Sequence, residues 1–583
     1  MSVFRLDLIN RYLKPHRRTL ILGAISLVIV NILSVAIPFE VRRVIDALQE
    51  GFTFKDVLKQ SFWIISLASV MAVVRLVSRQ LVFGVGRQVE VDLRQRLFDH
   101  MLIQDPGWVQ SIGSGEVITR STSDIENIRR LLGFAILSLT NTFLAYAFTI
   151  PAMIAINPWL TVASISLYPI MLGVVRLFGG RMVNQRRRQQ EALSQLSELI
   201  QEDLSGISAI KIYGQESAEG KAFSKLNNNY KTAAINLART ASTLFPLLQG
   251  ISSISLLLLL ALGSGLINQG ILTIGGLIAL ILYVERLVFP TALLGFTLNT
   301  FQLGQVSLER VEELLTNTPT IKDNINSKSL NSPVKGKLEA KGLCINYENS
   351  QKKILKNINF VIEPGELVAI VGPVGCGKTT LARALGRMVN ISKNQLFLDG
   401  NDVLELKLEE LRKNIALVPQ EGYLFTNTLQ DNLRYGEPNA SIEQVKDSAF
   451  QARLSEDIKG FPDGFKTLVG ERGITLSGGQ RQRTALGRAL LVNAPIIVLD
   501  DALASVDNKT AAAILYSIRQ QENRTILMIS HQLSAAAACD RILVLNEGQL
   551  VQEGKHESLI KVEGIYKKLW EREKAVEKID SVK

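Results

Sequence analysis

The chain has 583 residues, 47% of them hydrophobic, and a formal net charge of +11. This length exceeds one ordinary core and predicts roughly three or four domain-sized units. The positive charge does not by itself indicate a nucleic-acid partner, because arginines and lysines in the cytoplasmic loops of a membrane protein give the same balance. The three cysteines all lie in the second half, do not make a disulfide framework and fit a reducing compartment for that half.

Six apolar runs in the first half are long enough to cross a membrane, which takes roughly 20 mostly apolar residues. Apolar core helices of a soluble protein are the alternative, and they fit poorly with runs of this length. The predicted membrane helices cover about residues 19–40, 60–83, 133–155, 159–178, 244–268 and 274–297.

The segments that join these runs differ in charge. IAINPW joins the third run to the fourth, NQGILT joins the fifth to the sixth, and neither is charged. The stretches after the second and fourth runs are rich in positive residues, namely Arg87, Arg94, Arg96, Arg120, Arg129, Arg130, Arg181, Arg186, Arg187, Arg188, Lys211 and Lys221. Positive residues mark the cytoplasmic side, so both of these stretches and both termini are expected there. The pattern predicts an integral, multi-pass protein of a bacterial-type inner or plasma membrane.

A few charged residues fall inside the predicted runs: Arg75, Arg79, Arg176, Glu285 and Arg286. Charges within a membrane are costly and indicate function, here an amphipathic or anionic substrate. The alternative is that Glu285 pairs with an arginine inside the bundle, or that the arginines lie at the interface.

Residues 316–336 then lose periodicity and fill with Asn, Ser, Pro and Lys, which predicts a linker between a membrane domain, 1–315, and a second domain, 337–583.

The second domain contains a phosphate-binding pattern. Residues 366–385, ELVAIVGPVGCGKTTLARAL, read as a strand, a glycine-rich turn and a helix start. Such a loop wraps phosphates with backbone N–H groups at the helix N-terminus, while Lys378 faces the terminal phosphates and the Thr379 hydroxyl suits Mg²⁺. The predicted nucleotide-binding residues of this loop are Gly372, Pro373, Val374, Gly375, Cys376, Gly377, Lys378, Thr379 and Thr380.

Two further segments complete a nucleotide site. The strand-like run in IIVLDDALASVD ends at Asp500, where a carboxylate can hold the water shell of Mg²⁺. The segment TLSGGQRQRTALGRAL, 475–490, places Ser477, Gly478 and Gly479 before a helical pattern and predicts a second anion cradle. One chain that binds one nucleotide does not need two cradles, whereas two facing chains can each give one cradle to the other's nucleotide.

Together these motifs make the whole chain resemble an ABC exporter half-transporter. That resemblance implies an all-α six-helix transmembrane bundle with long intracellular helices, followed by an α/β P-loop NTPase domain. It also implies ATP and Mg²⁺ as cofactors, with Gln420, Thr379 and Asp500 at the metal. Residues 114–128 and 209–216 resemble the family's coupling helices, and residues 467–473 resemble the loop that contacts them.

The resemblance implies further roles at the nucleotide. Tyr347 would stack on adenine, unless it is an ordinary surface tyrosine, and Asp507 would lie in the loop that crosses the dimer interface. Asp501, His531 and Gln420 would be the catalytic residues, with His531 facing the γ-phosphate. A partner chain would receive the signature loop in trans, through Leu476, Ser477, Gly478, Gly479 and Gln480.

Asp501 departs from the family's pattern, which usually has glutamate after the Walker B aspartate. Aspartate is shorter by one C–C bond, about 1.5 Å, and a misplacement of roughly 1 Å can cost on the order of a hundredfold in rate. We therefore expect a slow site here and, because LSGGQ is intact, a heterodimer whose other subunit carries the glutamate. A homodimer with two slow sites is the alternative.

Three functional classes remain to be compared. An ATP-driven exporter subunit that moves an amphipathic drug, lipid or peptide by alternating access is favoured, with membrane lipid and a second half-transporter as partners. An ATP-gated channel or regulator would need only slow hydrolysis. A nucleic-acid-handling ATPase rests on the basic charge alone and would not need membrane runs, so no nucleic-acid partner is expected.

Overall fold

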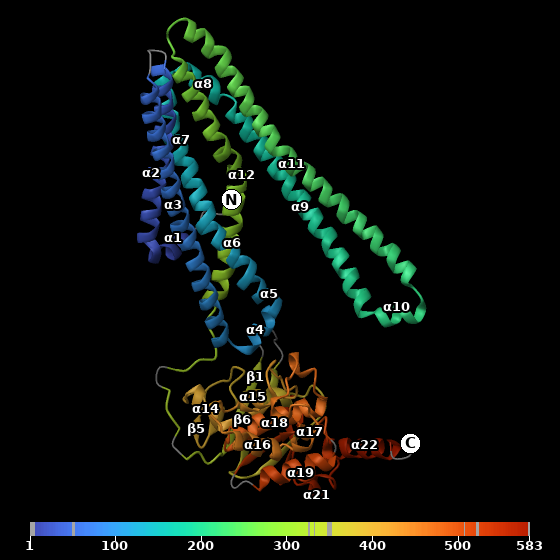
Figure 1. Ribbon diagram of the computed structural model, residues 1–583. Coiled ribbons are helices and arrows are strands. Elements are labelled where there is room, and N and C mark those ends of the chain that lie inside the picture. The colour runs from blue at the N-terminus through green and yellow to red at the C-terminus, as the bar shows by residue number, and fades with distance from the viewer. Residues whose placement is uncertain are drawn as a thin grey trace. The chain divides into compact units, whose positions relative to one another are not determined.

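The computed structural model describes residues 6–48, 53–324, 327–330, 333–346, 353–506, 508–520 and 524–580. Tyr347 and Asp507 lie outside these residues. The chain divides into two compact units (Figure 1), the first formed by Met1–Leu102 and Ile112–Asn317 and the second by Ile103–Ser111 and Thr318–Lys583. Each unit is described by itself.

The first unit is entirely helical in its described residues. Its elements are α1 (Leu6–Leu13), η1 (Lys14–His16), α2 (Arg17–Leu48), α3 (Phe54–Ile103), α5 (Ser114–Thr119), η2 (Arg120–Asp124), α6 (Ile125–Arg130), η3 (Leu131–Ala135), α7 (Ile136–Ile156), α8 (Pro158–Ile165), α9 (Tyr168–Ser205), α10 (Ile207–Tyr213), α11 (Glu216–Asn268) and α12 (Ile274–Thr316). The short turns η2 and η3 are π-helical and keep α5 to α7 in one continuous rod.

Six helical stretches of this unit are long and apolar enough to cross a membrane. They are Asp7–Leu48, Lys55–Ile103, Ser114–Ile156, Pro158–Ser205, Glu216–Asn268 and Ile274–Thr316. At 1.5 Å per residue, the 53 residues of α11 extend for about 80 Å, far more than the roughly 30 Å of a hydrocarbon core. The six predicted membrane helices are confirmed, and each belongs to a rod that runs well beyond the apolar layer.

The uncharged turns between neighbouring membrane helices are closed by helix caps. The Asn157 side chain accepts a hydrogen bond from Leu160 N at 3.0 Å, and Pro158 follows it as the first helical residue of α8. Thr273 caps α12 in the same way, accepting from Gly276 N at 3.0 Å. Asp46 of α2 accepts from Gly275 N at 2.8 Å, which fixes α2 against the start of α12. Both caps are readable in the short sequences IAINPW and NQGILT.

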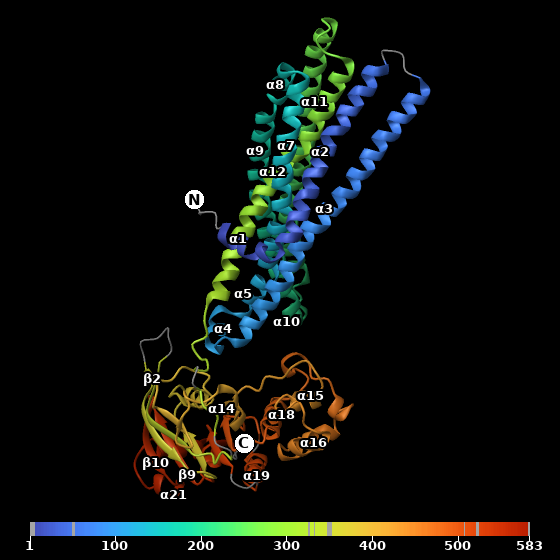
Figure 2. The same ribbon diagram turned by 90° about the vertical axis from the view of Figure 1, so that its left-hand side faces the viewer.

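Helices α9 and α11 pack along one another over most of their length and are joined at one end by α10, as both Figure 1 and Figure 2 show. Gly214 ends α10 in the left-handed conformation, with φ of 63°, which lets the chain turn back into α11. The α10 segment corresponds to the stretch predicted as a coupling helix, 209–216.

The second unit contains two β-sheets. The four-stranded sheet has the order β2-β1-β4-β5 and is antiparallel, and the six-stranded sheet has the order β10-β9-β3-β8-β7-β6. Their strands are β1 (Leu338–Asn346), β2 (Lys353–Ile362), β3 (Leu367–Val371), β4 (Leu396–Leu398), β5 (Asn401–Asp402), β6 (Ile415–Val418), β7 (Ile496–Asp500), β8 (Thr525–Ile529), β9 (Arg541–Asn546) and β10 (Gln549–Gly554).

Helices also belong to the second unit. They are α4 (Pro106–Ile112), α13 (Lys378–Leu385), α14 (Leu408–Asn414), α15 (Leu429–Arg434), α16 (Ile442–Gln451), α17 (Ser455–Lys459), η4 (Gly464–Lys466), η5 (Glu471–Gly473), α18 (Gly478–Leu491), α19 (Asn508–Arg519), α20 (Leu533–Ala536), α21 (His556–Leu559) and α22 (Ile565–Asp580). Figure 2 shows α15, α16 and α18 gathered to one side of the strands β2, β9 and β10.

The six-stranded sheet brings distant loops to one edge. Strand β3 runs parallel to β8, and β8 runs parallel to β7. All three strands are buried along their whole length, as their unbroken apolar sequences predict. Because the carboxyl ends of adjacent parallel strands lie together, the residues after Val371, Asp500 and Ile529 meet at this edge.

The segment predicted as a linker is attached to the second unit where the structure describes it. Asp105 accepts hydrogen bonds from Thr320 N at 2.8 Å and from Thr320 Oγ1 at 2.7 Å. Further along, Lys328 N donates to Glu405 O at 2.6 Å. A segment rich in polar residues can therefore be ordered by backbone hydrogen bonds without any apolar periodicity.

Candidate nucleotide site

The glycine-rich loop connects β3 to α13 and needs its glycines for different reasons. A Cβ atom on Gly372 would lie 2.0 Å from the carbonyl oxygen of Leu545, so no side chain fits there. Gly377 has φ of 109° and a Cβ atom there would lie 2.8 Å from Leu355 Cδ2. The loop is therefore held in a backbone conformation that only glycine tolerates, immediately before the first turn of a helix.

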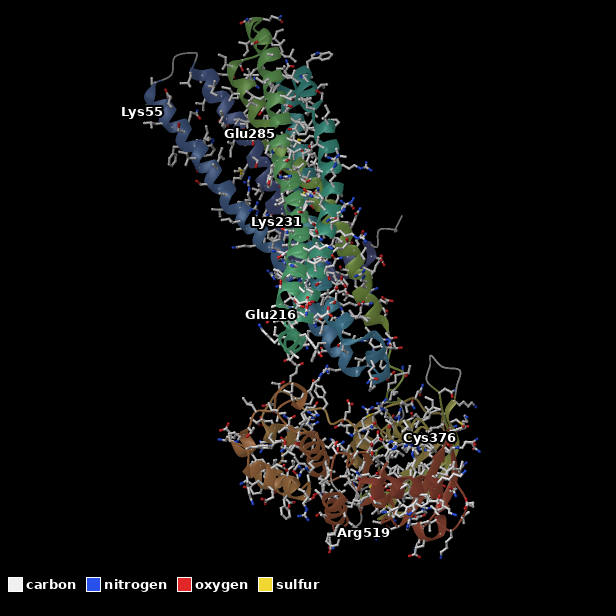
Figure 3. The ribbon with its side chains drawn as sticks, turned by 90° about the vertical axis from the view of Figure 1, so that its right-hand side faces the viewer. Lys55, Glu216, Lys231, Glu285, Cys376 and Arg519 are labelled. Atoms are coloured by element: carbon white, nitrogen blue, oxygen red, sulfur yellow. The ribbon has the colours of Figure 1, made fainter. Side chains whose placement is uncertain are left out.

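Lys378 is buried and its ammonium lies over the loop. Its Nζ donates to the carbonyl oxygens of Gly372 at 2.8 Å and Pro373 at 2.9 Å. Cys376 lies beside it, with its Sγ 3.8 Å from the same nitrogen. Burial raises the pKa of the Cys376 thiol, so it stays protonated at neutral pH. Figure 3 labels Cys376 within the second unit.

Thr379 and Asp500 are brought together from β3–α13 and β7. The Thr379 hydroxyl donates to Asp500 Oδ1 at 3.2 Å. Burial raises the pKa of the Asp500 carboxyl, and the Thr379 hydrogen bond opposes that rise. This pair supplies two hard oxygen ligands beside the phosphate loop, the kind of donor set that Mg²⁺ uses with phosphate oxygens and water. Among the described residues no group of three or more His, Cys, Asp or Glu is placed to hold a metal ion, so other ligands would come from outside these side chains.

Gln420, the third predicted metal residue, is exposed after β6. In the part of the chain that the structure describes, no hydrogen bond joins its side chain to Thr379 or Asp500. Its backbone oxygen accepts from Gln482 Nε2 at 3.3 Å, which ties the glutamine loop to α18 instead.

Asp501 and His531 are neighbours at the ends of β7 and β8. The backbone N–H of Asp501 donates to Ile529 O at 2.9 Å, and its Oδ1 accepts from the backbone N–H of His531 at 3.4 Å. Asp501 is buried and has φ of 51°, a conformation that costs an ordinary side chain energy and that clusters at functional sites. The structure thus brings Asp501 and His531 together. Gln420 follows β6, which runs parallel to β7, so it lies at the same edge of the sheet, although no hydrogen bond among the described residues joins it to either of them.

The signature loop is organised by its own helix cap. Ser477 Oγ accepts from Gln480 N at 3.3 Å and Gln480 Oε1 accepts from Ser477 N at 2.9 Å, a complete capping box. Gln480 Nε2 also donates to Asp457 Oδ1 at 3.1 Å. A Cβ atom on Gly479 would lie 2.9 Å from Ser505 O, so the loop packs closely on the segment after Asp501. Among the described residues, no hydrogen bond joins this loop to the glycine-rich loop of the same chain.

Two features of the site were not predicted. A pocket of about 650 Å³ is lined by Gln420, Arg472 and Gly478. The glutamine loop, the segment 467–473 and the signature loop, which are separate in the sequence, therefore line the same pocket. Glu573 of α22 accepts from Leu533 N at 2.7 Å and Ser534 N at 3.2 Å, fixing the backbone just after His531. The positive φ of Arg472, 52°, has no sequence signal, and Glu573 lies too far along the chain for local pattern to reveal its partner.

A bundle with six membrane-length helices, joined to an α/β fold with a phosphate loop, defines a multi-pass membrane ATPase. Residues 20–291 match the family model of the ABC transporter transmembrane region, and residues 355–504 match the ABC transporter model. The chain belongs to the ABC transporter family, as a membrane domain fused to an ABC ATPase domain.

Several known bacterial proteins are similar in sequence over most of the chain. The multidrug resistance-like ATP-binding protein MdlA of Buchnera aphidicola subsp. Baizongia pistaciae is 32% identical over 500 residues, covering 85% of this chain and 86% of the relative. The ATP-dependent lipid A-core flippase of Thiobacillus denitrificans is 30% identical over 568 residues, covering 96% of each. A solved structure of a bacterial Atm1-family ABC exporter with ATP bound superimposes with a TM-score of 0.77 at 26% identity, covering 95% of this chain and 98% of that one.

These similarities confirm the predicted fold class and the predicted exporter family. The chain is an ABC exporter that binds ATP and couples its hydrolysis to transport. It is a multi-pass membrane protein.

Proposed function

We propose that the chain is one subunit of a dimeric exporter that moves an amphipathic compound by alternating access, with Mg²⁺ bound beside ATP and the ATPase domain in the cytoplasm. The main support is the nucleotide-site edge of the six-stranded sheet, where the glycine-rich loop, Asp500 and Asp501 meet. Lys378 would face the terminal phosphates, while Thr379 and Asp500 would hold Mg²⁺. Tyr347 would stack on adenine.

The arrangement of the signature loop favours a site shared between two chains. Leu476–Gln480 starts a helix whose N–H groups suit an anion, yet no hydrogen bond among the described residues links it to the glycine-rich loop of the same chain. Each loop would therefore complete the nucleotide site of the partner. Closing around two ATP molecules would bias the membrane helices toward their outward-open state, and hydrolysis would reset them.

Asp501 supports a slow site in this chain. Its carboxylate already accepts from His531 N, is buried, and reaches about 1.5 Å less far than glutamate would. A misplaced base of this kind costs on the order of a hundredfold in rate. The intact signature loop favours a heterodimer, in which the partner supplies the glutamate and this chain completes the faster site.

Charged residues in the membrane helices support an amphipathic or anionic substrate. Arg286 of α12 donates to Asn31 Oδ1 at 2.7 Å and to Thr149 Oγ1 at 2.9 Å, both neutral groups. Glu285 is exposed on the same helix (Figure 3), and within the described parts of the chain no carboxylate lies within 4 Å of Arg286 or Arg75. Positive charges without a carboxylate partner inside membrane helices would be stabilised by an anionic group between the helices.

The assembly is tested by purifying the chain alone and together with a half-transporter that has glutamate after its Walker B aspartate. The expected result is slow ATP hydrolysis alone and a rise on the order of a hundredfold in the mixed dimer. Asp501→Asn should abolish the slow rate and leave the mixed dimer nearly unchanged. Strong activity of the chain alone that Asp501→Asn does not lower would overturn the heterodimer.

Transport itself is tested in inverted vesicles. An exporter concentrates a fluorescent amphiphile against its gradient when ATP is present, and Asp500→Asn stops it. An ATP-gated channel or regulator, the other function compatible with a slow Asp501 site, would only equalise the concentrations. That outcome would replace the exporter by the channel.

A further inference from the structure

A second pocket, of about 410 Å³, lies in the membrane unit, outside the nucleotide site. Its walls come from α3, from the turn where α6 passes into η3, and from α12. Three aromatic and three cationic side chains dominate the lining, namely Phe83, Phe134, Phe296, Arg87, Arg129 and Arg130. These residues come from three segments far apart in the sequence.

The two kinds of side chain occupy different depths. Phe83, Phe134 and Phe296 fall at the ends of three predicted membrane helices, 60–83, 133–155 and 274–297. Arg87, by contrast, lies one turn beyond the end of the first of these runs, and Arg129 and Arg130 precede the start of the next. The Phe134 and Phe296 rings meet edge to face with centroids 5.5 Å apart, which makes a firm apolar wall. The pocket is apolar toward the membrane and cationic away from it.

The cationic wall carries more positive than negative charge. Glu90 pairs with Arg87 at 3.2 Å, with Arg94 at 2.9 Å and with Arg129 at 3.3 Å. Glu126 pairs with Arg129 at 3.1 Å and with Arg130 at 2.7 Å. Four arginines therefore share two glutamates, and two positive charges of this network are not neutralised within it.

Individual donors in this wall also remain available. The Arg129 Nε atom is not one of them, because it is buried and lies 3.3 Å from Glu90 Oε2. The side chains of Arg87 and Arg130 are 65% and 53% exposed, so their guanidinium groups can reach a ligand without leaving their glutamates. Guanidinium forks bind phosphate and carboxylate through paired hydrogen bonds.

The backbone holds this wall in place. A Cβ atom on Gly86 would lie 3.0 Å from Arg129 O and 3.2 Å from Gly133 N, so α3 packs directly on the backbone of α6 and η3. The π-helical turn η3 then carries Phe134 into the pocket. Wide turns of this type occur frequently at functional sites.

We propose that this pocket binds an anionic amphiphile, with its phosphate or carboxylate at Arg87 and Arg130 and its apolar chain against the three phenylalanines. The two parts of such a molecule match the two walls in chemistry and in order. The binding needs neither ATP nor the slow Asp501 site, so it stands or fails separately from the proposed function. The ligand is either a phospholipid that resides there or a transported compound with the same kind of headgroup.

Two matched pairs of variants test the site in the full-length protein. Arg87 and Arg94 lie on the same helix and both pair with Glu90, but only Arg87 lines the pocket. Phe296 and Phe289 are two turns apart on α12 and similarly exposed, at 54% and 61%, but only Phe296 lines the pocket. Circular dichroism and size-exclusion chromatography establish that each variant is folded.

Binding is measured by native mass spectrometry in detergent without nucleotide, with dioleoyl phosphatidylglycerol, dioleoyl phosphatidylcholine and glycerol 1-phosphate as probes. We expect phosphatidylglycerol to bind best and glycerol 1-phosphate weakly. Arg87→Gln should weaken phosphatidylglycerol binding about tenfold or more through the lost charge-assisted hydrogen bond. Phe296→Ala should weaken it severalfold, and Arg94→Gln and Phe289→Ala should leave it unchanged.

The contrary results are equally specific. Equal binding of the two phospholipids, or equal losses in Arg87→Gln and Arg94→Gln, would mean an ordinary belt of interfacial arginines and would overturn the site.

A second experiment, in which Mg–ATP is added to the protein in lipid nanodiscs, distinguishes a resident lipid from a transported compound. A resident lipid stays bound during turnover, whereas a transported compound is released by the wild type and retained by Lys378→Ala.

Discussion

The ATPase unit and the membrane unit hold charge in different ways. In the ATPase unit the anion site is made mainly of backbone, in one short loop whose glycines no other residue can replace. In the membrane unit, by contrast, Arg286 is held by two side chains of helices far apart in the sequence, Asn31 and Thr149. A backbone site depends on a single segment, whereas a side-chain site depends on how several helices pack.

Replacing Lys378, the lysine that lies over the glycine-rich loop, should have the largest effect on the ATPase rate. Lys378→Ala removes the ammonium that lies over the loop and should lower ATP hydrolysis by about a hundredfold or more, the scale of losing one preorganised charged donor. ATPase rate and displacement of a fluorescent nucleotide measure this. Lys459→Ala, an exposed lysine of the same unit, is the control and should change neither. A modest loss in Lys378→Ala would show that the backbone alone carries the site.

Lengthening the side chain at position 501, beside Asp500, should raise the ATPase rate rather than lower it. Asp501→Glu restores the missing C–C bond and should raise the ATPase rate of the chain alone by roughly tenfold to a hundredfold. Asp463→Glu, in an exposed loop, should have no effect. If Asp501→Glu does not raise the rate, the backbone at this position, with φ of 51°, limits the site rather than the side-chain length.

In the membrane unit, removing the hydrogen-bond acceptor of Arg286 should lower the stability of the helix bundle. Asn31 is buried and accepts from Arg286, so Asn31→Leu leaves a guanidinium without that partner and should destabilise the bundle by about 2–3 kcal/mol. Thermal unfolding in detergent measures it. Ser26→Ala removes a hydroxyl of the same helix that donates to Leu22 O within its own turn, and it should change the midpoint little. Equal midpoints for both variants would mean that Arg286 finds another acceptor without cost.

Within the ATPase unit, one side chain acts on the backbone over a long sequence distance. Glu573→Ala removes the acceptor of Leu533 N and Ser534 N and should cost about 1–2 kcal/mol, the range of a lost helix cap. The midpoint of thermal unfolding should fall, and Glu571→Ala, exposed on the same helix, should leave it unchanged. A fall in ATPase rate without a fall in stability would instead indicate that Glu573 positions His531.

The smallest effect should come from the buried carboxylate of Asp500. Burial raises its pKa, so between the unfolded and native pKa values the native state binds more protons, and stability falls as the pH rises through that window. Asp500→Asn, without nucleotide or Mg²⁺, should therefore raise the unfolding midpoint slightly at pH 7. The gain should disappear as the pH falls below the usual aspartate range, where both proteins are uncharged at this position. A gain that is independent of pH would contradict the burial effect.

Features written in one continuous segment could be predicted from the sequence. The membrane helices follow from apolar length, and the phosphate loop from a fixed pattern of glycines and lysine between a strand and a helix. Thr379 and Asp500 were each expected at Mg²⁺ from their motifs, but their direct hydrogen bond depends on the order of strands in the sheet. The φ of Asp501 and the approach of Arg129 to Glu90 depend on packing between segments, and no local pattern encodes them.

The capping box of the signature loop has a consequence for association between chains. Ser477 and Gln480 fix each other's backbone N–H groups, and Asp457 holds the Gln480 amide, so the loop has one conformation before anything docks on it. Ordering a free side chain on binding costs about 0.5–1.5 kcal/mol, and here that entropy has already been lost in folding. A partner surface that meets this loop therefore meets a rigid template, and its release after each cycle need not be slowed by the refolding of a loop.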